Sequence, residues 1–303
     1  MAVIAVYSIK GGVGKTTLAF DLAWRAAQAG KRTLLWDLDL QGGAAYLLDE
    51  DEPQVPRAVS AFRPGGLLRQ QVRKTRFERL FHLPADESLR VLPNELARLR
   101  ERHRLTGLTH LLSGEFRQIV LDCPPALNEV SDQIISAADL IVVPLPPSPL
   151  AMRALETVRK ELAHNHADPP PVFPVLSMVD LRRKLHRDTV LGSGGHWPVV
   201  PLASAIEATA LKRAPIDTFA RGTKPARALA DLFAQVEARI ETLPSREAAR
   251  LRVMLSPTPR SPFESVPEEP AAAPAAQGRS TRRKSGEYRE NAAIRALRWL
   301  LRV

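Results

Sequence analysis

The chain has 303 residues, 45% of them hydrophobic and 25% charged, and its 43 lysines and arginines against 33 acidic residues give a formal net charge of +10. This composition predicts one large or two small globular domains, and the positive charge favours an anionic partner such as nucleic acid or an acidic membrane over a merely solvated basic surface. The single cysteine, Cys123, excludes a disulfide framework and any all-cysteine metal or iron–sulfur site within one chain.

The N-terminal segments predict an alternation of strand and helix. Ala2–Tyr7 is a short apolar run typical of a buried strand, and Thr16–Ala29 has the apolar spacing of a helix that ends at Gly30. The next predicted strand is Arg32–Asp39. The first residues carry no signal-peptide pattern and no apolar run reaches 18 residues, so we expect a cytoplasmic protein.

Further apolar segments continue this alternation as far as residue 178. They are LRVLP (89–93), FRQIVLD (116–122), DLIVVPL (139–145) and PVFPVLSM (171–178), and a helical pattern covers Met152–His164. Strands that alternate with helices predict an α/β fold, a doubly wound and mostly parallel sheet with helices on both faces. The stretch Arg57–Arg104 is strongly basic, with 12 basic and 5 acidic residues.

The composition changes after Leu255, which predicts three parts. A folded domain covers residues 1–255, a linker rich in Pro, Ala and Ser covers 256–284 and is expected to be disordered, and residues 285–303 form a basic amphipathic helix. In that helix the arginines at 295, 298 and 302 share one face, opposite Ile294, Leu297, Leu300 and Leu301. Such a helix suits an anionic bilayer, a protein partner or DNA.

A glycine-rich turn lies between the first strand and the first helix, which is the context of a phosphate-binding loop. The chain reads K-G-G-V-G-K-T-T here, and the usual G-x-x-x-x-G-K-[ST] pattern is not met because Ile9 stands at its first glycine. Lys15 is expected to neutralise the β- and γ-phosphates, and the Thr16 hydroxyl is expected to ligate Mg²⁺. The predicted nucleotide-binding residues are Lys10, Gly11, Gly12, Val13, Gly14, Lys15, Thr16 and Thr17.

This loop, with its early lysine, resembles that of the ParA/MinD superfamily of dimerising ATPases with a deviant Walker A motif, most closely its ParA-type members. The resemblance implies that Lys15 serves the nucleotide of its own subunit. It also implies that Lys10 reaches across a dimer interface to the ATP of the partner subunit, so that both lysines are catalytic and ATP joins the two subunits.

Two later segments extend the resemblance, which covers about residues 2–242. LLWDLDLQGGA (34–44) resembles the family's switch I, usually D-x-D-P-Q-G, with Leu40 in place of the proline; IVLDCPP (119–125) resembles its Walker B strand and switch II. The resemblance implies that Asp39 orients or activates the attacking water and that Thr16, Asp37 and Asp122 hold Mg²⁺. It further places Pro201 near the adenine.

The branches of the superfamily differ in their partners. The nitrogenase iron protein needs two cysteines per subunit, which excludes it, and no motif indicates the substrate pocket of a ligase. The resemblance to ParA implies an ATP-dependent homodimer on non-specific DNA that positions a plasmid, a chromosome locus or a protein cargo and is released by a ParB-like or cargo-adaptor protein. Its DNA contacts would be Lys212, Arg213, Arg221, Lys224 and Arg227.

The alternative is a MinD-like ATPase that binds an anionic membrane through the C-terminal helix. The phosphate loop begins within ten residues of the N-terminus, so we expect no preceding helix-turn-helix domain and no sequence-specific DNA recognition.

Overall fold

The computed structural model describes residues 1–50, 57–99, 103–165, 168–192 and 196–244. The chain divides into two units, Met1–Thr258 and Pro259–Val303, and all described residues belong to the first. The predicted linker (256–284) and the predicted C-terminal helix (285–303) therefore lie outside the described residues. Within the described ranges, no helix is long and apolar enough to cross a membrane.

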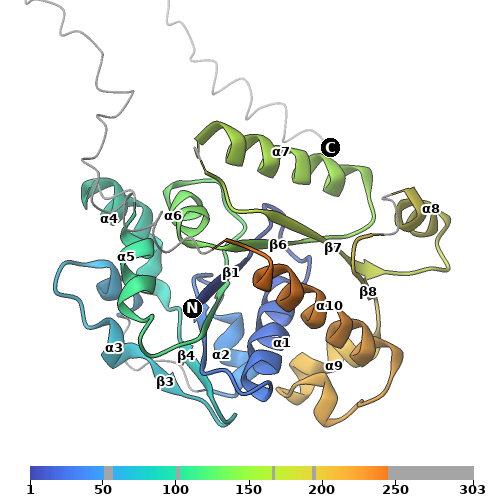
Figure 1. Ribbon diagram of the computed structural model, residues 1–303, viewed down its shortest axis with the longest axis horizontal. Coiled ribbons are helices and arrows are strands. Elements are labelled where there is room, and N and C mark those ends of the chain that lie inside the picture. The colour runs from blue at the N-terminus through green and yellow to red at the C-terminus, as the bar shows by residue number, and fades with distance from the viewer. Residues whose placement is uncertain (51–56, 100–102, 166–167, 193–195, 245–303) are drawn as a thin grey trace, which may run out of the picture. The chain divides into compact units, whose positions relative to one another are not determined.

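The first unit is built on one sheet whose strands run in the order β3-β4-β2-β5-β1-β6-β7-β8 (Figure 1). Neighbouring strands are parallel except for β3 and β4, which pair antiparallel at one edge. The strands are β1 Ala2–Val6, β2 Thr33–Asp37, β3 Arg73–Lys74, β4 Leu80–Leu83, β5 Gln118–Asp122, β6 Leu140–Leu145, β7 Val172–Val179 and β8 Val199–Pro201. The predicted fold class is confirmed.

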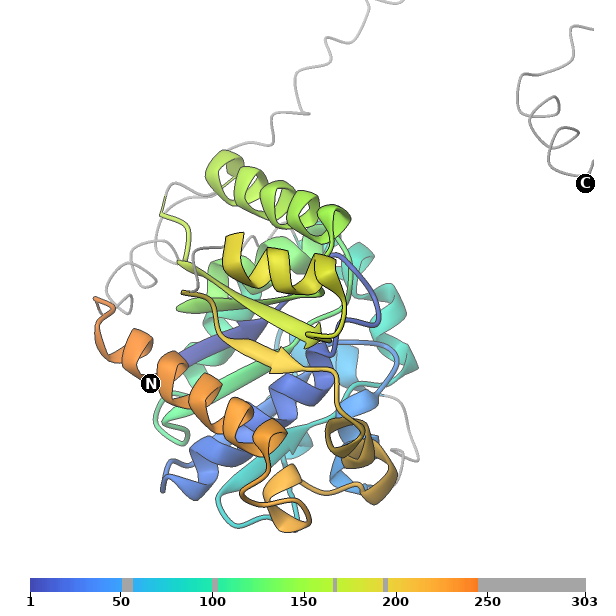
Figure 2. The ribbon, with the colours of Figure 1, turned by 90° about the vertical axis from the view of Figure 1, so that its right-hand side faces the viewer.

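Helices cover both faces of this sheet. Figure 2 shows it between α7 on one side and α1 and α10 on the other. The α-helices are α1 Lys15–Gln28, α2 Gly43–Leu48, α3 Leu68–Gln71, α4 Leu92–Leu99, α5 Arg104–Leu111, α6 Glu129–Ala137, α7 Pro149–Asn165, α8 Lys184–Gly192, α9 Ser204–Lys212 and α10 Lys224–Glu241. Short 3₁₀ turns add η1 Ala58–Phe62, η2 Glu87–Val91 and η3 Ile216–Thr218.

Two apolar clusters fill the space between the sheet and its helices. In β1, Val3 and Ala5 pack with residues of α4 to α7, whereas Ile4 and Val6 pack with residues of α1, α2 and α10. A strand alternates its side chains between the two faces, so a central strand that is covered twice must be apolar throughout. This requirement explains why the central strands could be recognised from continuous apolar runs.

The topology places the loop after β1 at the carboxyl ends of the central strands. The chain leaves β1, passes over β5 and enters the sheet again as β2, so β1 lies between β5 and β6. Ligands of doubly wound sheets bind outside the carboxyl ends of the strands, where the direction of such crossovers reverses. The predicted phosphate loop follows β1 at these carboxyl ends.

Two local expectations need correction. The segment Leu89–Pro93, interpreted as one of the apolar strands, forms the end of η2 and the start of α4. Asp86 accepts a hydrogen bond from the Ser88 N–H and so begins the turn, and Pro93 is tolerated in the first turn of a helix, where its missing N–H is not needed. The antiparallel β3–β4 hairpin was not predicted.

Candidate nucleotide site and basic face

The carboxyl ends of three adjacent strands meet at the centre of the site. The register pairs Val6 with Asp122 and Asp37 with Asp122, so the phosphate loop and both buried aspartates lie side by side. The Leu38 N–H donates to the Asp122 carbonyl at 2.9 Å, which extends this contact one residue beyond β2. The phosphate loop and the segments 34–44 and 119–125, all predicted to form the site, are thus brought together.

The phosphate loop has the backbone that an anion site needs. Gly12 and Gly14 have φ of 70° and 88°, in the left-handed region that favours glycine, and Val13 between them is buried. Gly14 is the N-cap of α1 and no side chain caps this helix. The first N–H groups of α1 are therefore available to phosphate oxygens at the positive end of the helix dipole.

The two lysines of the loop differ in their surroundings. Lys15 is 6% exposed, and its Nζ donates to the Lys10 carbonyl at 3.3 Å, inside the curve of the loop. The backbone N–H of Lys10 donates to the Ser8 hydroxyl at 3.3 Å. The half-buried Lys10 ammonium, by contrast, has no hydrogen bond or ion pair with any residue that the structure describes.

Asp37 organises the loop that follows β2. This buried carboxylate accepts the N–H of Asp39 at 2.9 Å with Oδ1 and the N–H of Ala44 at 3.1 Å with Oδ2. Burial raises the pKa of Asp37 well above its usual range, and the neighbouring Asp122 adds to the rise. Both oxygens thus fix the backbone of the loop, a contribution that the sequence alone did not indicate.

Asp39 lies on the same loop, closer to solvent. Its Oδ1 accepts the Gln41 N–H at 3.1 Å, and its carbonyl accepts the Gly42 N–H at 3.0 Å. Leu40, which stands at the proline position of the D-x-D-P-Q-G pattern that this loop resembles, is 41% exposed. The loop is therefore closed by hydrogen bonds of Asp39 without the fixed φ that a proline would supply.

Asp122 has the properties of a cation ligand. It is fully buried, and neither of its carboxylate oxygens accepts a hydrogen bond within the described part of the chain. Burial raises the pKa of Asp122 to about 7, although the nearby Thr16 hydroxyl lowers it. Buried oxygens without a donor are costly unless a cation or proton satisfies them, and carboxylate and hydroxyl oxygens are ligands that Mg²⁺ accepts. The residues present therefore fit a magnesium ion.

Gly43, which the sequence analysis did not single out, explains how α2 approaches the loop. A Cβ at this position would lie 3.0 Å from the Thr16 Cγ2 and 3.4 Å from its Oγ1. The start of α2 is thus in direct contact with the start of α1. The Gly42–Gly43 pair was the signal in the sequence, since two adjacent glycines after a strand often mark a close backbone approach.

Met178 is a second residue near the site that was not predicted. It has φ of 55° at an irregularity between β7 and β8, and its Cε would lie 3.9 Å from a Cβ at Gly14. No feature of the sequence distinguishes Met178 from an ordinary strand residue.

Pro201, proposed to lie near the adenine, is half-buried and ends β8. The N–H of the next residue, Leu202, donates to the Val179 carbonyl at 2.9 Å.

Cys123, directly after Asp122, is buried and its Sγ donates to the Leu121 carbonyl at 3.4 Å. Burial raises the pKa of this thiol well above its usual range, so it stays protonated. Cys123 is therefore a small packed residue beside the site.

The predicted DNA contacts lie around α9, η3 and the start of α10, and all five side chains are exposed. The Lys212 ammonium lies 5.5 Å from the centre of the Phe219 ring. Arg213 is not free, because it donates to Asp49 at 2.5 Å and its guanidinium lies 4.5 Å from the centre of the Tyr46 ring. Only some side chains of the predicted cluster are therefore free of contacts with acidic or aromatic residues in the described part of the chain.

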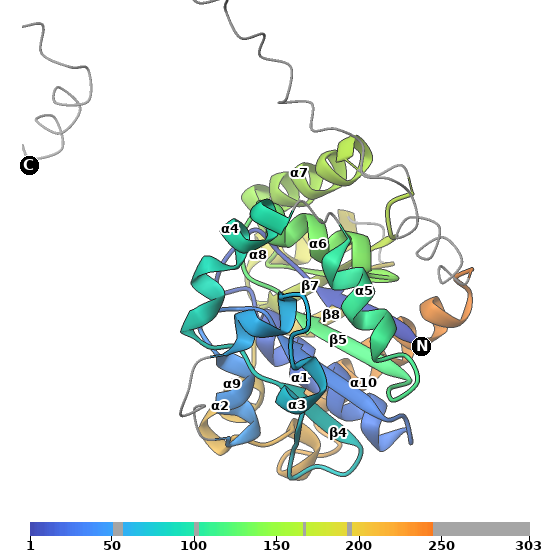
Figure 3. The same ribbon diagram turned by 90° about the vertical axis from the view of Figure 1, so that its left-hand side faces the viewer.

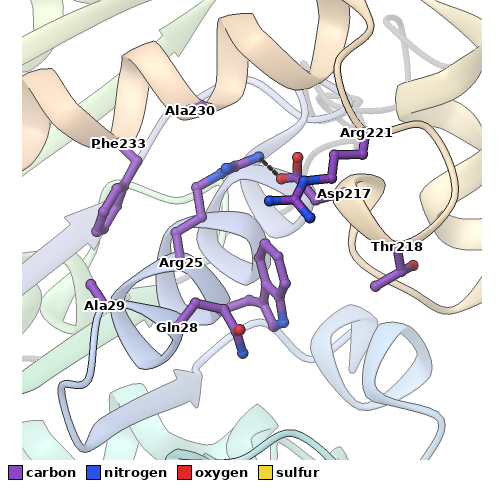
Figure 4. Close-up of a pocket in the computed structure, with 9 residues that line it drawn as sticks. Arg25, Gln28, Ala29, Asp217, Thr218, Arg221, Ala230 and Phe233 are labelled. Carbon is purple, nitrogen blue, oxygen red and sulfur yellow. Dashed lines mark hydrogen bonds and ion pairs between the residues drawn. The ribbon is translucent and has the colours of Figure 1, made fainter.

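Arg221 lines a pocket between α1, η3 and α10 (Figure 4), with a volume of about 500 Å³. Arg25, which also lines the pocket, forms ion pairs with Asp21 and with Asp217. The pocket residues of α1 begin at Trp24, and Gln28 lies 13 residues from Lys15, which is roughly 20 Å along a helix. The pocket is therefore not the phosphate site.

Comparison with known proteins identifies this arrangement. A family model described as an AAA domain matches residues 1–168, more than half of the chain. The chain is 32% identical to chromosome partitioning protein ParA of Myxococcus xanthus over 155 residues, which is 50% of this chain and 55% of that protein. It is 31% identical to sporulation initiation inhibitor protein Soj of Bacillus subtilis over 189 residues, which is 60% of this chain and 75% of Soj.

A solved structure of a Cyanothece McdA variant in complex with ATP has the same fold, with a TM-score of 0.68 and 18% identity over 78% of this chain and 96% of that one. The alignment with the Myxococcus protein spans about half of that relative's length. The chain belongs to the AAA domain family and, within it, to the ParA-like branch of the ParA/MinD superfamily of ATPases.

Proposed function

We propose that this ParA-like ATPase forms an ATP-dependent sandwich dimer, binds DNA without sequence preference and segregates or positions a plasmid, a chromosome locus or a protein cargo. A ParB-like or cargo-adaptor protein would stimulate hydrolysis and so release the dimer from DNA. The likeness to relatives named as partitioning proteins supports the class of process. The nucleoid is the expected location.

The proposal of a dimer rests on the different surroundings of Lys10 and Lys15. Lys15 is buried and its ammonium donates to the Lys10 carbonyl within its own loop, where it would meet phosphates bound by that loop. The Lys10 ammonium has no partner among the described residues, although it lies on the same loop. A cation that its own subunit leaves unpaired beside a phosphate site is suited to the phosphates of a second subunit.

Hydrolysis would depend on three carboxylates with different tasks. Asp37 holds the backbone of residues 38–44, and Asp39 on that backbone has an oxygen beyond its bond to Gln41 that could orient water toward the γ-phosphate. Thr16 and Asp122 would hold Mg²⁺, which neutralises charge that develops on the phosphate oxygens. Leu40 leaves this loop without the proline of the D-x-D-P-Q-G pattern that it resembles.

DNA binding would use Lys212, Arg221, Lys224 and Arg227, whose exposed side chains surround η3 and the first turn of α10. Contacts of this kind neutralise phosphates, so they fix affinity and salt dependence and carry no sequence information. A dimer would place two such faces on one rigid body and raise the affinity for DNA beyond that of the monomer.

A mixture of two inactive variants tests the proposed dimer. Lys10→Ala chains and Asp39→Ala chains are each expected to lack turnover. In a mixed dimer, one site keeps Asp39 and receives Lys10 from the other chain, so ATP turnover should partly recover. The Lys10→Ala chain alone should still bind ATP as a monomer, because Lys15, Thr16 and the backbone donors remain.

The contrary result is equally definite. If mixed dimers form, as measured by pull-down of two different tags, and turnover does not recover, then Lys10 acts on the nucleotide of its own subunit. Sizing in ATP is the matched measurement, since a protein that stays monomeric with ATP in both wild-type and Asp39→Ala forms would contradict the sandwich dimer itself.

The alternative of a membrane-associated, MinD-like regulator depends on the basic amphipathic pattern of residues 285–303. Sedimentation with ATP, offered DNA fragments or anionic liposomes separately, distinguishes the two. Binding to liposomes that is lost on deletion of residues 285–303, with no binding to DNA, would favour the membrane.

A further inference from the structure

Two arginines from distant segments share one carboxylate on the surface. Arg213, at the end of α9, donates to Asp49 Oδ1 at 2.5 Å, and Arg76, in the β3–β4 hairpin, donates to Asp49 Oδ2 at 3.4 Å. Arg76 also donates to the carbonyl of Arg213, so the hairpin is joined to α9 directly. Each oxygen of the carboxylate is thus used by a different arginine.

This contact is exposed. The side chains of Arg76, Asp49 and Arg213 are 42%, 44% and 45% exposed, so water and dissolved ions reach all three. Ion pairs at such a surface contribute little to the stability of a fold and are weakened by salt. An anion with two oxygens could therefore replace the carboxylate at small cost.

Asp49 is also connected to the phosphate site. It is the C-cap of α2, and the N-terminal end of that helix contacts Thr16 through Gly43 and is held by Asp37 through the Ala44 N–H. Figure 3 shows α2 close to α9 at this side of the molecule. One six-residue helix thus joins the candidate metal site to the two arginines.

We propose that Arg76 and Arg213 are a two-arginine part of the DNA-binding face and that Asp49 is its internal counter-ion, which a DNA phosphate displaces. This inference rests on the proposed DNA binding and adds to it a residue, Arg76, outside the predicted cluster, and a carboxylate that opposes binding. Arg213 adjoins Lys212 in the chain, so the arginine pair continues the basic surface of α9 onto the hairpin. A phosphate offers two oxygens to two arginines in the way that Asp49 does.

Asp49→Asn tests the proposal, since asparagine keeps the shape and accepts the left-handed φ of 60° at this position. The matched control is Glu207→Gln, which removes one charge from the exposed surface of α9 without a described arginine partner. Binding of a fluorescent duplex of random sequence would be measured with ATP across a salt series. Anionic phospholipid vesicles form a second arm.

Asp49→Asn should bind DNA about fivefold more tightly than wild type, because two arginines are released from a surface pair. Its plot of log K against log salt should be steeper by about 1 to 2, whereas Glu207→Gln should match wild type in slope. Addition of Arg76→Gln to Asp49→Asn should remove about half of the gain in slope. Thermal unfolding is the check that each variant is folded.

Other outcomes overturn the proposal in separable ways. If Asp49→Asn and Glu207→Gln behave alike on DNA, while Arg221→Glu with Lys224→Glu loses DNA binding, the inference fails and the proposed function stands. If Asp49→Asn gains affinity for vesicles alone, the arginine pair belongs to a membrane surface. If wild type binds no DNA even at low salt, the proposed DNA binding and this inference fail together.

Discussion

The two ends of α1 serve different purposes and are built in different ways. At the N-terminal end, backbone donors, glycines with positive φ and a buried lysine form the phosphate loop within one short segment. At the C-terminal end, Arg25 of α1 meets Asp217 and Arg221, which come from a segment almost 200 residues later, only in the folded chain. Loss of one residue at the first end should therefore abolish nucleotide binding or turnover. At the second end, loss of a single cation should weaken DNA binding by degrees and in a salt-dependent way, and only combined charge reversals should abolish it.

The broadest loss is expected at the first end, from Lys15→Ala, because turnover and dimerisation both depend on the nucleotide binding that it removes. Loss of a buried cation that pairs with phosphate should cost about 2–5 kcal/mol, which is roughly 30-fold or more in nucleotide affinity. Titration with a fluorescent ATP analogue at physiological salt measures this. An affinity equal to that of wild type would mean that the loop does not bind phosphates as proposed, and Lys10→Ala is the matched control that should retain binding.

Asp39→Ala should affect turnover and spare binding. Loss of the group that orients water should lower the ATPase rate by about 10²- to 10⁴-fold. Nucleotide affinity should persist, because Lys15 and the backbone donors are untouched, and ATP-bound dimers should accumulate on a sizing column. Unchanged turnover in this variant would remove Asp39 from the proposed chemistry.

At the second end, Arg221→Glu together with Lys224→Glu should abolish DNA binding at physiological salt, and the salt slope should fall by about 2. ATP-dependent dimerisation should stay intact. Arg153→Glu with Lys160→Glu, on the exposed side of α7 across the sheet, is the matched control and should keep DNA affinity closer to wild type. Equal losses in both pairs would mean that only total charge matters.

The smallest effect concerns Asp21, a buried carboxyl that pairs with Arg25 within α1. Burial raises the pKa of Asp21 to about 6, above the value near 3.8 of an unfolded chain. A raised carboxyl pKa means that the folded state binds a proton more tightly than the unfolded chain does. Protonation of Asp21 therefore stabilises the fold below about pH 4, and this contribution is lost as the pH rises through 6.

Asp21→Asn removes that dependence. The melting temperature of the variant relative to wild type should therefore rise between pH 4.5 and 7.5. The rise should be about 2–4 °C for each kcal/mol by which the substitution avoids the cost of a buried charge. The exposed Asp231→Asn on α10 provides the control and should show less change. A constant difference across this range would contradict the proposed burial of a charged Asp21.

The parts of the site that follow from local chemistry could be predicted from the sequence. The phosphate loop requires glycines and a lysine at fixed spacing directly after a strand, and Asp122 ends an apolar run that only a buried strand explains. The central strands could be recognised for the same reason, since burial on both faces requires continuous apolar residues.

Contacts between distant segments could not be predicted in this way. The pairing of Arg213 with Asp49 joins residues 164 positions apart, and one sequence contains no signal for it. The hydrogen bonds of Asp37 to two backbone N–H groups depend on how its loop turns back. The strand predicted at Leu89–Pro93 was wrong because a short apolar segment fits a strand and a 3₁₀ turn equally well, and the capping by Asp86 decided between them.

The packing of α10 on α1 also bears on how the protein is made. Leu229, Leu232 and Val236 of α10 lie in the same buried cluster as Leu18 and Leu22 of α1. A ribosome must therefore translate as far as Glu241 before the helix that begins at Lys15 has its full set of neighbours. At about 5–20 residues per second, that interval is roughly 10–50 s. During it, α1 lacks the apolar contacts that α10 supplies, so we expect the phosphate loop at its N-terminal end to be less firmly held than in the folded domain.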